Sequence, residues 1–211
     1  MTDAHSRAAR FATISTQGAD VREKEEGSSL AEAMISVTQD PDPRVRAAAL
    51  GALVRMQNDP CGAWEDAASD HDSLVRRRAA ELSPTVKGVT VETMLLLLQD
   101  GEPLVAEAAS WAAGEITWPI GDKRQIVNAL SDATTTHPDP LIREAAVAAL
   151  GALGDPDGLT AVLTACADRP AIRRRAVLAL AAFEGDEVEE ALQAALNDTD
   201  WQVRQAAEDL Q

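Results

Sequence analysis

Apolar residues recur along this chain with the period of an α-helix. The stretch from 142 to 153 is apolar at six positions on one helical face: Ile142, Ala145, Ala146, Ala149, Leu150 and Leu153. Residues 45–56 repeat this spacing, and residues 172–183 follow it with fewer matches. Such a stripe predicts an amphipathic helix that buries one face and leaves the other exposed.

A short motif precedes each of these helices: an acidic residue, two further residues, Val or Ile, and usually Arg. The aliphatic residue of the motif stands at positions 45, 75, 105, 142, 172 and 203, which are 30, 30, 37, 30 and 31 residues apart. The acidic residue suits a helix N-cap, and the Pro that follows it in four of the six motifs suits the first helical turn. The period predicts about six repeats.

A second, shorter helix is expected before each of these helices. The expected ranges are 29–38, 61–68, 91–99, 123–131, 157–167 and 187–197. Helix pairs this short cannot bury an apolar face alone, whereas stacked pairs share one core. The predicted fold is therefore an all-α solenoid of about six two-helix repeats. The seven extra residues between the third and fourth motifs fit either 117–121 or 134–136.

The two ends of the chain differ from the repeats. We expect an N-terminal segment at 1–28 and the repeat solenoid at 29–211. Residues 1–17 either form an Ala-rich helix that caps the core or are disordered, and 18–28 has the polar composition of a linker. The C-terminal end of the last helix is a candidate surface for pairing with a second copy of the chain.

The pattern acid-x-x-Val/Ile-Arg-x-x-Ala resembles that of the HEAT family, especially the short repeats first noted in phycobilisome lyase subunits. The resemblance covers about residues 29–210. It implies a right-handed α-α superhelix in which the second helix of each repeat lines the concave side. It also implies a ladder of contacts between neighbouring repeats, which would join Asp42, Asp72, Asp139 and Asp200 with Arg46, Arg76, Arg143, Arg173 and Arg204. We expect the ladder to weaken at the third repeat, where Glu102 and Ala106 replace Asp and Arg.

The concave groove of such a fold is the expected surface for a partner. Residues two, six and nine or ten positions after each aliphatic residue should project into it. Trp111 is the candidate anchor, unless the ring is partly buried against Trp118. The residues expected to bind the partner are Arg77, Glu107, Trp111, Glu115, Glu144, Arg174 and Leu178. Alternatively, Arg77 and Arg174 pair with Glu107 and Glu144.

Charge and apolar content restrict the class of partner and the compartment. With 19 Lys and Arg against 35 Asp and Glu, the net charge is −16, which disfavours nucleic acid because binding to it depends on cations that neutralise phosphates. The longest apolar run, 94–98, is far too short to span a membrane, and the first 18 residues lack the apolar core of a secretory signal. Cys61 and Cys166 suit a reducing compartment. We expect a cytoplasmic protein.

The sequence shows no pattern typical of catalysis or of a cofactor. His5, His71 and His137 lack metal-ligand spacing, and neither a phosphate-binding glycine loop nor a nucleophile elbow is present. The predicted function is therefore a protein–protein interaction scaffold that binds a protein or peptide without catalysis, cofactor or metal. The alternative is an enzyme of the HEAT-like DNA glycosylase type, in view of Trp111 and Glu115, or of the cofactor-lyase type.

Overall fold

The computed structural model describes residues 35–56 and 62–210, which fall into two compact units. Unit 1 ends at Thr93, and unit 2 begins at Met94. The predictions for residues 1–28, for most of the first outer helix and for Cys61 lie outside the described residues.

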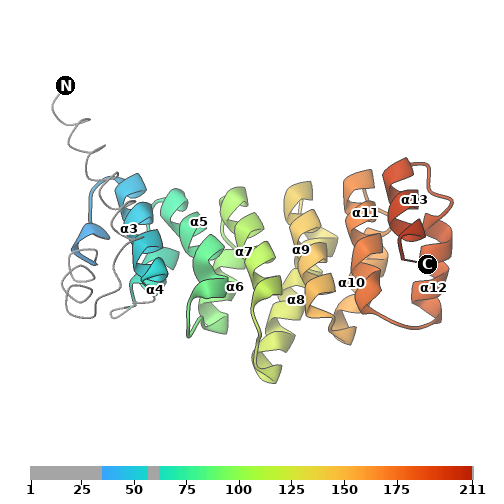
Figure 1. Ribbon diagram of the computed structural model, residues 1–211, viewed down its shortest axis with the longest axis horizontal. Coiled ribbons are helices and arrows are strands. Elements are labelled where there is room, and N and C mark those ends of the chain that lie inside the picture. Colours follow the sequence, from blue (N-terminus) through green and yellow to red (C-terminus); the bar gives the residue numbers. More distant parts are fainter. Residues whose placement is uncertain (1–34, 57–61, 211) are drawn as a thin grey trace. The chain divides into compact units, whose positions relative to one another are not determined.

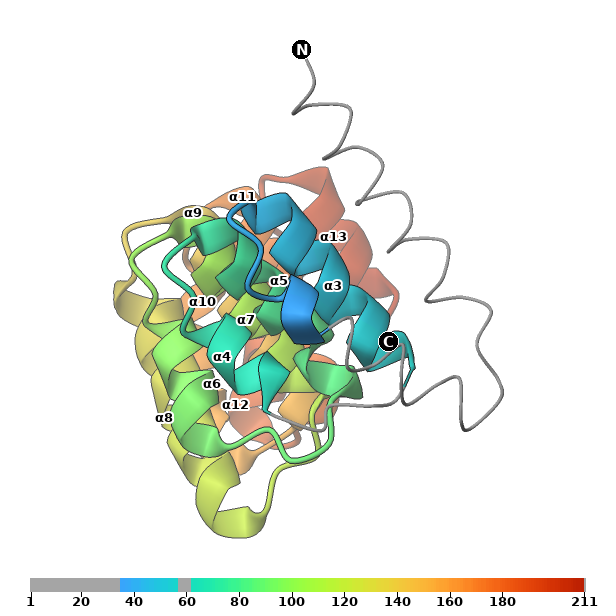
Figure 2. The same ribbon diagram turned by 90° about the vertical axis from the view of Figure 1, so that its left-hand side faces the viewer.

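The described part of unit 1 contains a complete helix pair and the inner helix that precedes it. Its helices are α3 (Pro43–Arg55), α4 (Ala63–Ala68) and α5 (Ser73–Leu82), followed by the 3₁₀ turn η1 (Ser83–Thr85) and the start of α6 (Val91–Leu98). Helix α3 packs against α5, and α4 contacts both (Figure 2). The buried Trp64 ring of α4 donates an Nε1–H bond to the Ala79 carbonyl of α5 at 2.8 Å. This hydrogen bond links α4 to α5 within the pair.

Unit 2 is a stack of helix pairs. Its helices after α6 are α7 (Pro103–Glu115), α8 (Ile120–Thr136), α9 (Pro140–Leu153), α10 (Leu159–Ala165), α11 (Pro170–Ala179), α12 (Asp186–Ala195) and α13 (Trp201–Glu208). The 3₁₀ turn η2 (Pro156–Gly158) lies between α9 and α10, and η3 (Leu180–Ala182) lies between α11 and α12. The inner helices α7, α9, α11 and α13 form one row, and α8, α10 and α12 each pack on the inner helix that follows (Figure 1). The described residues contain no strand, which confirms the all-α repeat fold.

The motif of the repeats starts the inner helices as expected. Asp42, Asp72, Asp139 and Asp200 are N-caps, and each carboxylate accepts a hydrogen bond from the backbone N–H two residues later, at 2.8–3.0 Å. Glu102 and Arg169 occupy the same position without a side-chain bond. The aliphatic residue of every motif is at most 2% exposed. Burial of each such side chain contributes about 1.5–3 kcal/mol.

The additional length of the fourth repeat lies in its outer helix. We expected a helix at 123–131, but α8 runs for 17 residues and extends beyond both ends of that range. Trp118 precedes α8; it is buried and donates an Nε1–H bond to the Ala113 carbonyl at 2.9 Å. The additional residues are therefore divided between the two segments: 117–121 contains the loop before α8 and its first residues, and 134–136 forms its last turn.

Two glycines bring the inner helices of unit 2 close together. A Cβ atom on Gly114 of α7 would lie 2.8 Å from the Cα of Ala149 in α9. A Cβ atom on Gly151 of α9 would lie equally close to the Cα of Ala179 in α11. Both distances are far below ordinary carbon contacts of about 3.5–4.0 Å. Because a side chain of any size would separate these helices, glycine permits the tight row that carries the candidate site.

Candidate functional site

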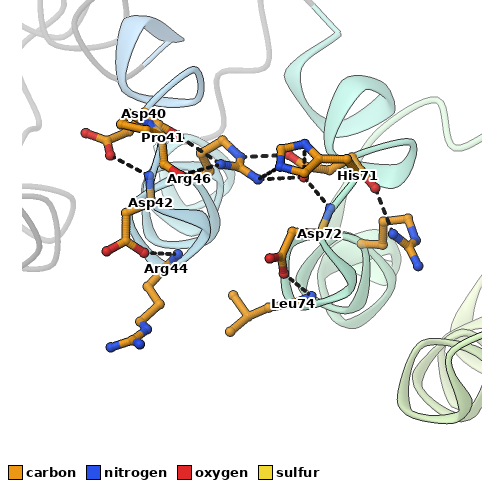
Figure 3. A network of polar contacts seen from close by, with 10 residues as sticks. Asp40, Pro41, Asp42, Arg44, Arg46, His71, Asp72 and Leu74 are labelled. Carbon is orange, nitrogen blue, oxygen red and sulfur yellow. Dashed lines mark hydrogen bonds and ion pairs between the residues drawn. The ribbon is translucent and has the colours of Figure 1, made fainter.

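Arginines of the inner helices bind the repeat that follows. Arg46 of α3 donates from Nε and Nη2 to the two oxygens of Asp70, at 2.8 and 2.7 Å (Figure 3). Arg143 of α9 makes the same two bonds to Asp168, at 2.7 and 3.0 Å. Two parallel bonds of this kind are strong and directional, because both partners are charged and both groups are planar.

Arg173 of α11 repeats the arrangement with Asp198, at 2.8 and 2.6 Å. The remaining Nη1 group of each of these arginines donates to a carbonyl of the turn before its own helix, such as Asp40 for Arg46. Each guanidinium therefore joins its own turn to the turn of the next repeat. Arg76 and Arg204 also bond to carbonyls of their own turns, those of Asp70 and Asp198.

The carboxylates of this ladder are not the ones that we predicted. Asp72 and Asp200 cap their own helices, and the arginines bind Asp70 and Asp198, which lie two residues earlier. Asp42 and Asp139 likewise serve as caps. The cap carboxylate is directed at its own helix, so the aspartate before it is the one available to the preceding repeat.

The arginines lower the pKa of the ladder carboxyl groups. Burial acts to raise the pKa of Asp70, but the hydrogen bonds and charge of Arg46 outweigh it, so that pKa lies below its usual value. For Asp168 and Asp198 the hydrogen bond from the arginine is the largest influence, and their pKa values are lowered as well. These carboxylates stay charged at neutral pH.

The ladder is interrupted between α7 and α9. Ala106 stands where the other inner helices have Arg, and it is buried. His137 stands two residues before the cap Asp139, the position that Asp70 and Asp198 hold in their repeats, and its Nδ1 accepts the Asp139 N–H bond at 3.1 Å. Both the arginine and the aspartate of the ion pair are thus replaced between α7 and α9. We had expected a weaker ladder at the third repeat because of Ala106.

The exposed face of α7, α9 and α11 carries a chain of three interacting side chains. The Trp111 ring of α7 is 39% exposed. The Cζ atom of Arg175, from α11, lies 5.2 Å from the centre of this ring, within cation–π range. Nη2 of Arg175 lies 3.6 Å from Oε1 of Glu144 on α9. The three residues connect successive inner helices and hold the Trp ring at the surface.

The other predicted partner-binding residues have varied surroundings. Glu115 and Arg174 are exposed, while Glu107 and Leu178 are half-buried. Arg77 lies on α5 in unit 1, where its Nε pairs with Glu81 of the same helix at 3.0 Å. The alternative pairing of Arg174 with Glu144 is wrong for a physical reason: the next residue on the helix, Arg175, reaches that carboxylate.

Three residues of this face were missing from the prediction. One is Arg175, and the others are the exposed Leu104 and Leu141, at the starts of α7 and α9. Each leucine immediately precedes the buried aliphatic residue of its motif, so it lies outside the positions that we expected to project into the groove. A usable signal was present, because Leu104 is seven residues before Trp111 and therefore lies on the same helical face. We call Leu104, Trp111, Leu141, Glu144 and Arg175 the inner-helix patch.

The described residues give little support to acid–base or metal chemistry. No group of three His, Cys, Asp or Glu side chains within 35–56 and 62–210 could hold a metal ion. Burial raises the pKa of the Cys166 thiol to about 11, so it is protonated at neutral pH and a poor nucleophile. None of the helices in this part of the chain has the length and apolar character needed to cross a bilayer.

Stacked helix pairs, capped inner helices and an arginine–aspartate ladder define an α-solenoid repeat protein. Three family descriptions match the sequence: "HEAT repeats" at residues 91–171, "HEAT repeat" at 30–59 and "PBS lyase HEAT-like repeat" at 172–198. The chain belongs to the HEAT-repeat family. A search of curated proteins gave no match.

Solved structures of repeat proteins have a similar fold. An engineered protein aligns with a TM-score of 0.61 and 18% identity, over 85% of this chain and 94% of its own. The Escherichia coli protein YibA aligns at 0.62 and 14%, over 89% and 75%. A designed armadillo repeat protein, solved in complex with the peptide (KR)4, aligns at 0.60 and 15%, over 84% and 96%. At these identities the likeness concerns the fold alone.

Proposed function

We propose that this protein is a non-catalytic interaction scaffold and that a segment of a partner protein binds across the inner-helix patch of unit 2. The observation that carries the proposal is the exposed Trp111 ring, which Arg175 holds in place. Aromatic residues and arginines are the usual anchors of protein interfaces, because they provide a large contact area at a low cost in conformational entropy.

The surroundings of the ring also favour a protein partner. Leu104 and Leu141 add exposed apolar surface on the same two helices, and Glu144 and Arg175 add one charge of each sign. An apolar centre with a polar rim is typical of protein interfaces. The net charge of −16 disfavours a nucleic acid. A peptide bound to a designed repeat protein of similar fold supports the same use of this architecture.

The proposal is tested by comparing what immobilised variants retain from native lysate. Trp111→Ala removes the anchor. Trp201→Ala is the matched control, because it removes a Trp ring that is 64% exposed on α13, outside the patch. Far-UV circular dichroism verifies that both variants are folded. We expect a defined set of proteins to bind the wild type and Trp201→Ala, and to be lost from Trp111→Ala.

A second variant separates the role of Arg175 from that of the ring. Arg175→Gln removes the cation above Trp111 and the contact with Glu144, and it should weaken binding of the same proteins by about tenfold. If Trp111→Ala and Arg175→Gln retain every protein as strongly as the wild type, the patch is not the binding surface and the proposal fails.

A further inference from the structure

A cationic hollow in unit 1 lies between the inner helices α3 and α5. Its volume is about 380 Å³. Three arginines line it, Arg44 and Arg55 from α3 and Arg78 from α5. Apolar contact surface is provided by Ala47 and Ala48 of α3 and by the exposed Leu74 of α5. Figure 3 shows Arg44 and Leu74 extending side by side from the starts of the two helices. The inner-helix patch, which is in unit 2, contributes no residue to this hollow.

Two of the guanidinium groups converge on one glycine. The position that a Cβ atom would take on Gly51 is 3.0 Å from Nη2 of Arg78 and 3.5 Å from Nη1 of Arg55. These two like-charged groups therefore approach each other at the same point of the α3 surface. Glycine leaves the space for Arg78 to lie against α3, because a side chain at this position would push it away.

The charges in the hollow are poorly balanced by the protein itself. Arg78 pairs with Glu81 of its own helix at 3.1 Å. For Arg44 and Arg55, the part of the chain that the structure describes provides no carboxylate within ion-pair distance. This is notable in a chain with 35 acidic and 19 basic residues. Like charges in proximity repel each other, and a bound anion would relieve the repulsion.

The chemistry of the hollow favours a peptide carboxylate over a phosphate. A phosphate site usually uses backbone N–H groups at a helix N-terminus. Here the carboxylates of Asp42 and Asp72 already accept the N–H groups of Arg44 and Leu74, so these backbone groups are not available to a phosphate. Ala47, Ala48 and Leu74 offer apolar contact that a phosphate cannot use. An acidic side chain next to an aliphatic one uses both halves of the lining.

The positions of the arginines limit the spacing of the acidic residues. The Cα atoms of Arg44 and Arg55 are eleven residues apart on one helix, roughly 16 Å, and the Arg55 guanidinium reaches back to Gly51, so its charge lies closer to Arg44 than this. Two side chains four residues apart on an extended peptide are separated by roughly 13 Å, which fits within that distance. We propose that the α3–α5 hollow binds an acidic peptide segment in which two carboxylate side chains, about four residues apart, flank an aliphatic residue.

The test uses the full chain and a fluorescein-labelled peptide with the sequence Glu-Ala-Leu-Ala-Glu, followed by fluorescence anisotropy. We expect saturable binding that weakens as salt is added, since the contacts are partly exposed ion pairs. The peptide Gln-Ala-Leu-Ala-Gln should bind at least tenfold more weakly. Replacing Leu in the peptide by Ala should also weaken binding severalfold, whereas a simple anion site would not respond to that change.

Protein variants locate the site. Arg55→Gln and Arg78→Gln should each weaken binding by about tenfold. Arg77→Gln is the matched control, because Arg77 is the adjacent residue on α5, also pairs with Glu81 and does not line the hollow. Its affinity should stay within twofold of the wild type. Circular dichroism confirms that each variant is folded.

Several outcomes would overturn this proposal. They are the absence of saturation up to about 1 mM protein, equal binding of the Gln peptide, an equal loss in Arg77→Gln, and displacement of the peptide by inorganic phosphate with no dependence on the Leu residue. Trp111→Ala should leave binding of this peptide unchanged. Failure here and failure of the inner-helix patch are therefore separate results.

Discussion

A single methyl group added at Gly151 should destabilise unit 2, although alanine is the better helix former. The residue lies within α9, at a point where this helix approaches α11 closely. The new Cβ atom would be 2.8 Å from the Cα of Ala179 and 2.7 Å from its Cβ. Neither atom belongs to a flexible side chain end, so the two helices must move apart to relieve the contact.

Two opposing effects set the size of the change. Replacing Gly by Ala in a helix interior gains about 1 kcal/mol from the lower entropy of the unfolded chain. Forcing an extra carbon into a packed contact costs about 1–3 kcal/mol. Because the contact at Gly151 is with backbone, we place the cost near the upper end. The net free energy of unfolding should fall by about 1–2 kcal/mol.

Gly121 provides the matched control for this substitution. It also lies within a helix of unit 2, α8, but no atom lies within 4 Å of the position of its Cβ. Gly121→Ala should therefore leave the stability unchanged or raise it by up to about 1 kcal/mol. The two variants make the same chemical change, one in the first turn of α8 and the other near the C-terminal end of α9, and the main difference between them is the space available.

Urea unfolding followed by circular dichroism and by tryptophan fluorescence measures both variants. Two probes are needed because repeat proteins can unfold in steps. In a separate thermal unfolding experiment, the midpoint temperature of Gly151→Ala should fall by several degrees, at about 2–4 °C per kcal/mol for a chain of this size. If the urea and thermal midpoints of this variant equal or exceed those of the wild type while Gly121→Ala behaves as expected, the close approach of α9 and α11 is wrong.

Further predictions concern the ladder and the thiol. Arg143→Met should lower the free energy of unfolding by about 1–3 kcal/mol, because it leaves the half-buried Asp168 unpaired. Arg77→Met, which removes the more exposed pair with Glu81, should lower it by at most about 1 kcal/mol. Equal losses for the two variants in urea unfolding would contradict this prediction. Since the pKa of Asp168 is lowered in the folded state, its contribution is complete above the unfolded value of about 4 and disappears as pH falls through the folded value. In Asp168→Asn, the free energy of unfolding should therefore decrease less between pH 5 and pH 2 than it does in the wild type. An unaltered dependence on pH would count against the ladder. Cys166, whose pKa is raised to about 11, should react with iodoacetamide at pH 8 far more slowly in folded than in unfolded protein; equal rates in a Cys61→Ser background would contradict its burial.

The sequence was most informative about the elements of each repeat. The motif at Asp139 and Ile142 specifies a cap, a helix start and a buried residue within four positions, and local chemistry decides all three. The length of α8 was harder to predict, because polar residues at both ends of an exposed outer helix fit a helix or a loop equally well. The buried residues of α8 lie away from its two ends, so the packing of this helix on α9 and α10 could not be used to predict where it starts and stops.

The side-chain partners between helices were less predictable, because they depend on the offset between neighbouring helices. In the segment from Asp198 to Asp200, two aspartates are equally suited to cap a helix and to bind an arginine. The sequence alone could not say that Asp198 binds Arg173 and that Asp200 caps α13. In the same way, one residue of rotation decides whether Arg174 or Arg175 covers Trp111.

The replacement of Arg and Asp by Ala106 and His137 makes the joints of unit 2 chemically unequal. The α9–α11 and α11–α13 joints each contain an ion pair whose carboxylate protonation would neutralise. The α7–α9 joint has Ala106 and His137 in place of this pair, and it shares with α9–α11 only the close approach at a glycine. Acid should therefore loosen the stack from its C-terminal repeats first, with α7 and α9 separating last. Neighbouring repeats thus share one architecture but respond to different solution conditions.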